Sequence, residues 1–564
     1  NNKNFKRALE LCQEYSSNKD LHILNNLKGI IYINLKDPKR AIEYFKKSLN
    51  FKENYLEAYA NLANSYFNIK NISKSIETIK KGLNYDANNP NLNFNLGFFF
   101  SENFQYQKAI KQYQKVIKLG HNKEMAYNNI GNIYINEKNY LKAKDNFLEC
   151  LKLNSSNYLT INNLIRSLIL KRDFIQATKY QKISDKLKIK NSIHFINKAE
   201  LLFFQKKYEQ AINILKEFCE KYKENIDAHI SLSLIYSNLG KFEKSYKLID
   251  DIYKLNSNDN TLNLIQSMNL LKKGNFKDGW KLYDNSLQIK NNYYPQIPFW
   301  KGEDLKTKKI LVYEDQGIGD SIQFSKFLFS LKNLCDSIRI EVRESAVSLF
   351  QRNILNIKIS KKGLNLNGDC DYKISFASLN NFFFKNIVKN EKKLFKTDEE
   401  ILVKWKKKIN SKNLKVGLTW SGNLYGVNEP FRSIKVEKLQ KILSLNCDFI
   451  CLQKDIWERD KEYFKNSKIK YLGDNDFLET ASIIENLDLV ISTDTSILHL
   501  SSSLGKLTWG LISFNPDWRW WKYNSPPFYN NLIEYKQNKF NDWDNVLNKV
   551  YDDLKNLESK VVQD

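Results

Sequence analysis

A small residue recurs every 34 positions along the first half of this chain. Twelve residues before each of these positions lies a second, mostly small residue, and three residues after that lies a large apolar or aromatic one. Small residues let two helices approach closely while a bulky neighbour fills the space beside them. The pattern therefore predicts eight stacked helix pairs of one design. The three series are Ala41, Ser75, Ala109, Ala143, Ala177, Ala211, Ser245 and Gly279; Gly29, Ala63, Gly97, Gly131, Ile165, Ala199, Ser233 and Ser267; and Tyr32, Tyr66, Phe100, Tyr134, Leu168, Leu202, Tyr236 and Leu270.

A two-helix unit with this period is typical of tetratricopeptide repeats, so the sequence predicts an α-solenoid over residues 1–288. Ala8 precedes Ala41 by 33 residues and adds a partial unit, which gives about eight to nine repeats. Asn71, Asn139 and Asn275 fall where the turn between the two helices is expected. A solenoid offers an extended concave surface, and we expect a peptide or a partner protein in that groove.

The composition changes near residues 285–300. All ten Trp residues lie at or beyond Trp280, and Asn291, Asn292, Pro295 and Pro298 predict a linker. From Lys308 onward, short apolar runs alternate with amphipathic segments, which is typical of parallel βαβ units. We expect two doubly wound lobes, residues 300–400 and 412–556, separated by the lysine-rich stretch 390–412. The expected strands are 310–313, 338–342, 372–376, 416–420, 449–452, 487–491 and 507–512.

The formal net charge is +26. The excess is nearly all Lys, spread along the chain, and no basic block with interleaved aromatic residues stands out. Solvated lysines on helix faces explain this charge, and we expect no specific nucleic-acid partner. Attraction to an anionic surface or an acidic substrate stays open as the alternative. No stretch approaches 18 uninterrupted apolar residues, so we expect no membrane span, with peripheral association left open.

Seven cysteines without a Cys-x-x-Cys pair disfavour both a zinc site and a disulfide framework. We therefore expect no metal, and a reducing, cytoplasmic location. The chain begins at Asn1 without a basic-then-apolar leader, so a fragment that has lost a signal peptide is the other interpretation.

A first candidate site follows the strand at 310–313. Gln316, Gly317, Gly319 and Asp320 lie directly between this strand and a helix. The glycines allow backbone N–H groups to approach a ligand, and Asp320 falls at the mouth of the expected cleft. A simple tight turn with Asp320 as the helix cap is the alternative.

A second candidate site combines a polar turn with an arginine. Trp420 and Asn423 follow the strand at 416–420, and Arg432 lies nine residues beyond Asn423. Arg is scarce in this chain, and it suits a two-pronged contact with phosphate. An ion pair between the lobes is the alternative role for Arg432.

A third candidate site opens the helix after the strand at 487–491. Asp494, Thr495 and Ser496 place hydroxyl groups and free amides at a helix N-terminus, where a pyrophosphate can bind. His499, one turn later, faces either the cleft or the core. The following loop contains Asp517, Trp518 and Arg519; its rings either stack on a sugar or base, or pack against the other lobe.

These residues resemble bacterial tetratricopeptide-repeat proteins whose C-terminal domain is similar to heptosyltransferases (glycosyltransferase family 9) and, more distantly, to O-linked N-acetylglucosamine transferases. The matching segments occur in order between residues 274 and 525. They are 274–280 with Tyr283, 314–324, 417–423, 432–434, 452–453, 494–500 and 516–520.

The resemblance implies a GT-B glycosyltransferase of two Rossmann-like lobes that inverts the configuration at the anomeric carbon of the sugar. It also implies that the enzyme needs no metal and no cofactor, since the nucleotide-sugar is a substrate. By position, Asp320 matches a general base. Thr495, Ser496 and the amide of Ile497 match the diphosphate contacts, with Asp494 and His499 in the same segment. Arg432 then balances charge on the leaving nucleotide, and Gln453 contacts the nucleotide.

Departures from the family leave the donor open. Ser496 stands where heptosyltransferases commonly have Gly, and heptosyltransferases lack a solenoid. Two hypotheses follow. The first is a glycosyltransferase that acts on a protein or cell-surface glycan presented by the repeats. The second is a non-catalytic repeat scaffold with a degenerate GT-B domain, because a fold alone does not establish a function.

Overall fold

The computed structural model describes residues 2–14, 20–187, 191–290, 294, 296–354, 357–363, 369–384, 393–423, 429–521 and 528–561. Of the expected linker, Asn291, Asn292 and Pro295 lie outside this set. The contacts divide the chain into two compact units, Asn1–Ile214 and Leu215–Asp564.

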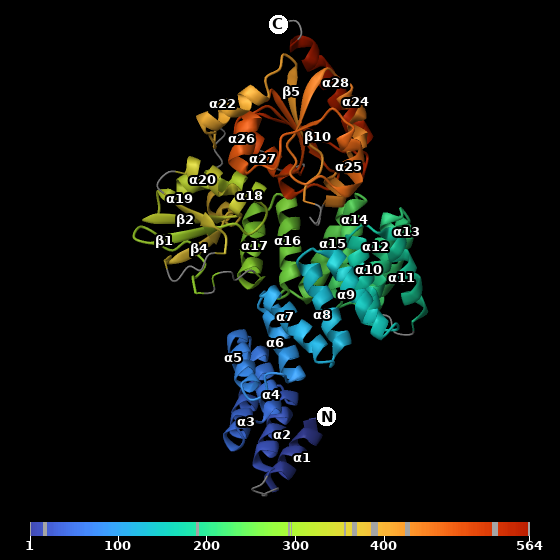
Figure 1. Cartoon of the computed structure of the whole chain (residues 1–564), viewed down its shortest axis with the longest axis vertical. Coiled ribbons are helices and arrows are strands. Elements are labelled where there is room, and N and C mark those ends of the chain that lie inside the picture. The colour runs from blue at the N-terminus through green and yellow to red at the C-terminus, as the bar shows by residue number, and fades with distance from the viewer. Residues whose placement is uncertain are drawn as a thin grey trace. The chain divides into compact units, whose positions relative to one another are not determined.

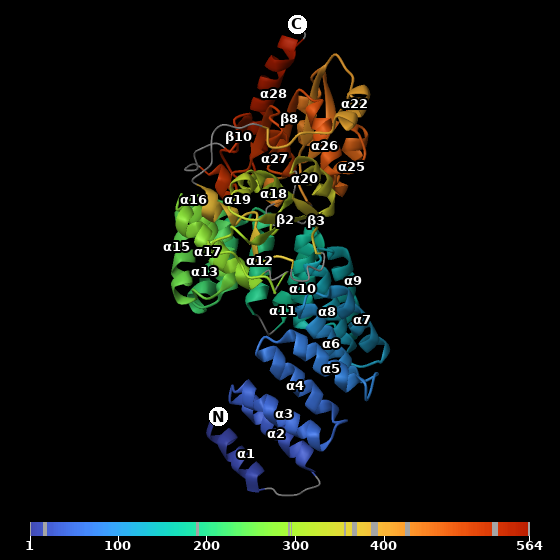
Figure 2. The same ribbon diagram turned by 90° about the vertical axis from the view of Figure 1, so that its left-hand side faces the viewer.

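The first half of the chain folds into consecutive helix pairs (Figures 1 and 2), and neighbouring helices pack together from α1 to α12 in the first unit and from α14 to α17 in the second. A single helix, α1 (Asn2–Glu14), precedes the pairs. The pairs are α2 (Leu21–Asn34) and α3 (Pro38–Phe51), α4 (Leu56–Asn68) and α5 (Ile72–Leu83), α6 (Pro90–Glu102) and α7 (Tyr106–Lys118), α8 (Lys123–Asn136) and α9 (Tyr140–Leu153), α10 (Tyr158–Leu170) and α11 (Phe174–Lys186), α12 (Ser192–Phe204) and α13 (Tyr208–Lys221), α14 (Ile226–Asn238) and α15 (Phe242–Leu255), and α16 (Asn260–Lys272) and α17 (Phe276–Lys290).

The periodic small residues lie where the helices of a pair meet, as the sequence predicts. The alanines of the first series are fully buried. A Cβ atom on Gly131 would lie 2.4 Å from a ring carbon of Phe147, and one on Gly97 would lie 2.9 Å from the Tyr113 ring. Glycine at these positions therefore makes room for an aromatic ring of the second helix.

The turn inside each pair contains one residue with positive φ. In six consecutive pairs this residue is not glycine, with φ between 56° and 68°, whereas the last two pairs have Gly240 and Gly274. In five pairs the next residue is Asp or Asn and its side chain caps the second helix, whereas Gln105 and Lys241 form no such bond. Asn71 Oδ1, for example, accepts a hydrogen bond from the Lys74 amide at 3.1 Å, and Asn139 Oδ1 does so from the Lys142 amide at 3.2 Å. The asparagines that the sequence placed in these turns thus act as N-caps.

The second half of the chain contains two fully parallel sheets. The first has the order β3-β2-β1-β4 and the second the order β10-β9-β8-β5-β6-β7. In each sheet the chain starts in the middle, builds outward on one side and then crosses to the other, an order common in doubly wound α/β folds. The strands are β1 (Lys309–Tyr313), β2 (Ser337–Val342), β3 (Lys358–Lys361), β4 (Tyr372–Ser375), β5 (Leu414–Thr419), β6 (Cys447–Cys451), β7 (Lys470–Tyr471), β8 (Leu489–Thr493), β9 (Thr508–Ile512) and β10 (Leu532–Lys536).

All seven expected strands are present, and β3, β7 and β10 are additional. These three lie at sheet edges and are short or largely exposed, so they lack the apolar runs that mark a central strand. The helices of this half are α18 (Ile318–Phe324), α19 (Leu328–Lys332), α20 (Val347–Asn353), α21 (Leu379–Phe383), α22 (Glu399–Lys408), α23 (Glu429–Arg432), α24 (Gln440–Leu443), α25 (Glu458–Lys465), α26 (Phe477–Glu485), α27 (Ser496–Ser503) and α28 (Trp543–Val561).

The last helix pair shares a hydrophobic core with the α/β region. Leu271 of α16 and Trp280 and Tyr283 of α17 belong to the same buried cluster as β1, β2 and part of the second sheet. The Trp280 ring meets Trp518 edge to face, with 5.2 Å between ring centroids. This packing holds the last helix pair against both the lobe that contains β1 and the loop that bears Trp518.

Candidate functional site

A pocket of about 330 Å³ opens at the carboxyl ends of β5, β6 and β8. The strand order of this sheet reverses between β5 and β8, and the carboxyl-end crevice at such a point is where open α/β sheets bind ligands. The size falls within the range of small-molecule sites. Ile318, Arg343 and Ser345 of the first lobe close the pocket from the opposite side.

The pocket has one apolar and one polar side. Leu452, Phe477 and Ile483 supply apolar surface, whereas Thr495 and Ser496 supply hydroxyl groups. A pocket lined by both apolar and polar side chains suits a ligand with an aromatic ring at one end and charged or hydroxyl groups at the other.

The polar side contains the N-terminus of α27. Thr495 is the N-cap residue, but its side chain forms no cap hydrogen bond with the helix; its hydroxyl instead lies 3.1 Å from that of Ser492. The first amides of α27 are therefore left without the side-chain acceptor that a cap usually provides. Together with the helix dipole, this end of α27 suits an anion.

Gln453 shapes the wall between β5 and β6. Its Oε1 accepts a hydrogen bond from the Ser421 amide at 2.9 Å, and its Nε2 donates to the Asp455 carbonyl at 2.7 Å. Trp420, by contrast, is fully buried in the core and donates its indole N–H to Asp460 at 3.3 Å. Gln453 lines the pocket, as does Asn423, whereas the Trp420 ring points away from it and serves packing.

Arg343 follows β2 and is anchored by a buried carboxylate. Its Nε lies 3.0 Å from Glu314 Oε1, and its amide donates to Glu314 Oε2 at 3.3 Å. Glu314 is 3% exposed and Arg343 is 43% exposed. The anchoring leaves part of a preorganised guanidinium facing the pocket. The sequence contained a usable signal for this residue, because Arg343 is a rare arginine directly after an expected strand.

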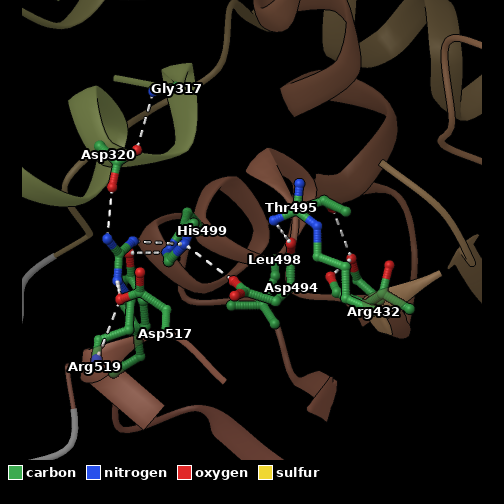
Figure 3. Close-up of polar contacts among 12 residues, drawn as sticks. Gly317, Asp320, Arg432, Asp494, Thr495, Leu498, His499, Asp517 and Arg519 are labelled. Carbon is green, nitrogen blue, oxygen red and sulfur yellow. Dashed lines mark hydrogen bonds and ion pairs between the residues drawn. The ribbon is translucent and has the colours of Figure 1, made fainter. Parts of the chain in front are cut away.

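A second polar cluster joins the two lobes around Arg519 (Figure 3). One Arg519 nitrogen donates to Asp320 Oδ1 at 2.6 Å, and its Nε donates to Asp517 Oδ1 at 2.9 Å. Asp320 Oδ2 accepts from the Gly317 amide at 3.1 Å. The alternative interpretation of Asp320 as the helix cap is wrong, because Gly317 occupies the N-cap position and Asp320 lies in the first turn of α18, where it accepts a hydrogen bond from the Gly317 amide. Asp320 is also a partner of Arg519 across the cleft. Burial alone would lower the pKa of Arg519, but Asp517, Asp320 and Asp494 together raise it.

His499 and Asp494 lie behind this arginine. His499 is 3% exposed, with Nδ1 3.1 Å from the Tyr529 hydroxyl and Nε2 3.7 Å from Asp494 Oδ1. Burial, with Arg519 and Arg432 nearby, holds the pKa of His499 well below its usual range. Burial also raises the pKa of Asp494, against the effect of Arg432 and Arg519. His499 is therefore a neutral core residue at neutral pH.

Gly319 allows the two lobes to meet at this point. A Cβ atom there would lie 2.9 Å from His499 Cδ2 and 3.3 Å from Ser496 Cα. The glycine therefore serves the close approach of α18 to α27, in place of the ligand contact that the sequence suggested.

Arg432 acts on the loop that precedes α27. Its NH1 donates to the Asp494 carbonyl at 2.7 Å (Figure 3). The structure thus gives Arg432 a main-chain contact, and its contact with phosphate stays a prediction. Through this bond Arg432 holds the start of α27 in position.

The loop that bears Asp517, Trp518 and Arg519 rests on the last repeats. Trp518 is 2% exposed and packs on Trp280 and Phe276, so its ring takes the packing role of the two roles considered. Lys272 Nζ donates to Asn515 Oδ1 at 2.8 Å, and burial lowers the pKa of Lys272 to about 8.

Of the expected site residues, the structure brings two groups together. Asn423, Gln453, Thr495, Ser496 and Ile497 line the pocket. Asp320, Asp494, His499, Asp517 and Arg519 form the interlobe cluster. Gln316 belongs to neither group, because it donates a hydrogen bond to the Tyr283 hydroxyl of α17.

A profile of the tetratricopeptide repeat family matches residues 24–55, 56–89 and 126–157. These segments correspond to the pairs α2–α3 and α4–α5 and to most of α8–α9. The N-terminal half of the chain is therefore built of tetratricopeptide repeats, a protein-binding architecture, and an α/β region with two parallel sheets follows it. No curated protein matches the chain.

Several solved structures resemble part of the chain. PilF of Pseudomonas aeruginosa is 17% identical, covers 38% of this chain and 97% of its own, and has a TM-score of 0.33. Yeast Tom70 is 20% identical over 45% of this chain and 55% of its own, with a TM-score of 0.35. MamA is 23% identical over 28% of this chain and 91% of its own, with a TM-score of 0.26.

Among the described helices, none is both long and apolar enough to cross a bilayer.

Proposed function

We propose that the α/β region is a GT-B glycosyltransferase of two Rossmann-like lobes, which moves a sugar from a nucleotide-sugar to a protein or cell-surface glycan. The observation that carries the proposal is the pocket at the strand-order reversal between β5 and β8, where an uncapped helix N-terminus adjoins apolar side chains. The apolar side chains suit a nucleoside and the helix end suits its diphosphate.

In the proposed reaction, the oxygen of an acceptor hydroxyl attacks the anomeric carbon of the sugar. The bond from that carbon to the phosphate oxygen breaks, and the nucleoside diphosphate leaves with the electron pair. Asp320 takes the proton from the acceptor hydroxyl. Thr495, Ser496 and the Ile497 amide hold the diphosphate, and positive charge from Arg343 offsets the charge that develops on it.

Asp320 can act as the base only if Arg519 yields one of its contacts. Arg519 lies among three carboxylates, Asp320, Asp517 and Asp494, so a shift toward Asp517 keeps the guanidinium paired while Asp320 meets the acceptor. The ion pair then keeps Asp320 occupied until an acceptor arrives.

The repeats contribute a second, protein-binding role. The first helices of four consecutive pairs have a partly exposed Asn at the same repeat position, namely Asn61, Asn95, Asn129 and Asn163, whereas the equivalent Asn197 of the next pair is fully buried. Neighbouring repeats align some of these amides; Asn61 Nδ2, for example, donates to Asn26 Oδ1 at 3.0 Å. Side-chain amides both donate and accept, so a row of them suits the main chain of an extended peptide. This row supports a peptide or partner protein in the groove.

A charge placed at the start of α27 tests the donor site. Ser496→Asp adds a negative charge in the first turn of α27. This charge interacts favourably with the helix dipole and so keeps the helix stable, but it repels a phosphate. Sugars linked to UDP, GDP, ADP and CMP are tested in turn. We expect one of these four nucleotide classes to raise the melting temperature of the wild-type chain and to leave that of the variant unchanged. Ser192→Asp makes the same change at the first residue of α12 and should leave the response intact. No response of the wild type to any donor would reject the donor site.

Asp320 and Asp517 both pair with Arg519, so variants of the two distinguish a loss of catalysis from a loss of the fold. Asp320→Asn should abolish sugar transfer and keep nucleotide binding, whereas Asp517→Asn removes a partner of Arg519 but keeps the base. Equal turnover in Asp320→Asn and the wild type would remove Asp320 from this role. The scaffold hypothesis predicts partner capture by the repeats with no transfer in any of these proteins.

A further inference from the structure

One edge of the N-terminal repeat array carries cations at positions where the backbone favours glycine. The positive-φ residue of the turn is Lys36, Lys70, Lys138, Arg172 or Lys206 in five of the first six pairs, and Phe104 in the other. Left-handed backbone disfavours any residue with a Cβ atom, and glycine is its usual occupant. Five cations in such positions mean that the chain accepts backbone strain at each of these turns.

A second row of cations lies at the third residue of the second helix in each of the first four pairs. Arg40, Lys74, Lys108 and Lys142 each lie over the aromatic ring of the third periodic series, at 5.4–5.7 Å from the ring centroid. The ring holds the long side chain beside the turn. Because successive pairs stack in the same orientation, both rows run along the same edge. These nine residues, 36, 40, 70, 74, 108, 138, 142, 172 and 206, form the basic ridge.

The ridge is exposed and only partly neutralised. Seven of the nine residues are lysines, and none of these seven forms an ion pair with a carboxylate within the described part of the chain. Arg40 pairs with Asp37 at 3.4 Å. The acidic residues of the same turns and of the first two residues of the second helices are Asp37, Glu102, Glu137, Asp173 and Glu209, so nine cations face five carboxylates. Along the sequence these lysines look scattered, and only the stacking gathers them.

Large apolar side chains lie exposed along the same edge. Ile69 is 38% exposed, Phe104 71%, Leu141 54% and Ile175 85%. Each lies in a turn or in the first two residues of a second helix. Cations that alternate with exposed apolar tips match a lipid headgroup layer, which attracts the charge and takes up the apolar groups. Double-stranded nucleic acid would use the charge and leave the aliphatic tips in water.

We propose that the basic ridge docks the repeat array on an anionic lipid surface. This inference is independent of the nucleotide site. It places the protein peripherally on a membrane through headgroup attraction and shallow insertion of the four apolar side chains.

The test uses the full chain and sedimentation with vesicles. The wild type should bind vesicles of phosphatidylcholine and phosphatidylglycerol, lose binding at high salt, and ignore phosphatidylcholine alone. Glycine at all five positive-φ cations should weaken binding by on the order of a hundredfold or more. The same variant should melt no lower than the wild type, because glycine relieves the left-handed backbone.

Two further variants keep the outcome clear. Gln at the four ring-stacked cations lowers the charge without changing a turn, and it should also weaken binding. Gln at five exposed lysines in the distal halves of second helices removes the same charge elsewhere and should have little effect; these are Lys46, Lys118, Lys152, Lys182 and Lys186. Wild-type failure to bind anionic vesicles, or equal loss in ridge and control variants, would overturn the proposal. Ridge-dependent binding of an oligonucleotide without vesicle binding would also overturn it, in favour of nucleic acid.

Discussion

Gly131→Ala should destabilise the repeat array although alanine is the better helix former. Gly131 lies in α8 against Phe147 of α9, whose ring is fully buried. The pair α4 and α5 differs from α8 and α9 at both of these repeat positions. It has Ala63 in place of the glycine and Ile79 in place of the phenylalanine, and both are fully buried. The sequence thus pairs glycine with a ring and alanine with an aliphatic side chain.

The size of the effect follows from the contact. The added Cβ would lie 2.4 Å from Phe147 Cε1, far inside the separation of about 3.5–4.0 Å at which carbon atoms attract. Overpacking of this severity costs about 3 kcal/mol, the upper end of the usual range. The higher helix propensity of alanine offsets about 1 kcal/mol of this cost. The free energy of unfolding of the α8 and α9 pair should therefore fall by about 2 kcal/mol.

A double-mutant cycle isolates the contact. Phe147→Ile alone leaves a cavity and also destabilises, but Gly131→Ala with Phe147→Ile recreates the Ala63 and Ile79 pair. We expect a favourable coupling of about 1–3 kcal/mol between the two changes. Because repeat arrays unfold in segments, amide hydrogen exchange of α8 and α9 is the measurement, with urea unfolding beside it. A neutral Gly131→Ala, or a double variant no better than the sum of the single ones, would refute the reasoning.

Three further predictions concern the second half of the chain. Burial raises the pKa of the Asp284 carboxyl to about 7. The protonated carboxyl therefore stabilises the fold fully below its unfolded pKa of 3.8, and this stabilisation is lost as the pH rises through about 7. Asp284→Asn should make the melting temperature less dependent on pH in this range and raise it above about pH 7. Gly240→Ala should loosen the loop at Phe514 in hydrogen exchange, because its Cβ would lie 2.9 Å from that ring, whereas Gly120→Ala, also at positive φ but with open space, should not. Arg343→Gln should weaken a nucleoside diphosphate about tenfold in calorimetry and leave the nucleoside unchanged.

Much of the fold follows from local patterns. The period of 34 residues predicts the helix pairs, and the buried apolar runs predict seven of the ten strands, because both signals arise from which side chains must leave water. The edge strand β10 escaped prediction, since its alternating Glu534, Tyr535 and Lys536 are compatible with an exposed loop.

The candidate site was predictable only in part. Gln453, Thr495 and Ser496 stand at strand ends or a helix start, so the rule that ligands meet the carboxyl edge of a parallel sheet finds them. Arg343 and Ile318 come from the other lobe. The position of Arg343 directly after an expected strand marks it as a candidate, but only the packing of the two lobes shows that it and Ile318 face this pocket.

The sequence by itself determined the repeat and the alternation of strands and helices, because each depends on spacing along the chain. Tertiary structure alone decided the roles of single residues. Trp420 and His499 lie in the core, and Gly319 serves helix approach. Lysines far apart in sequence share one edge, because stacking turns a period along the chain into neighbours in space.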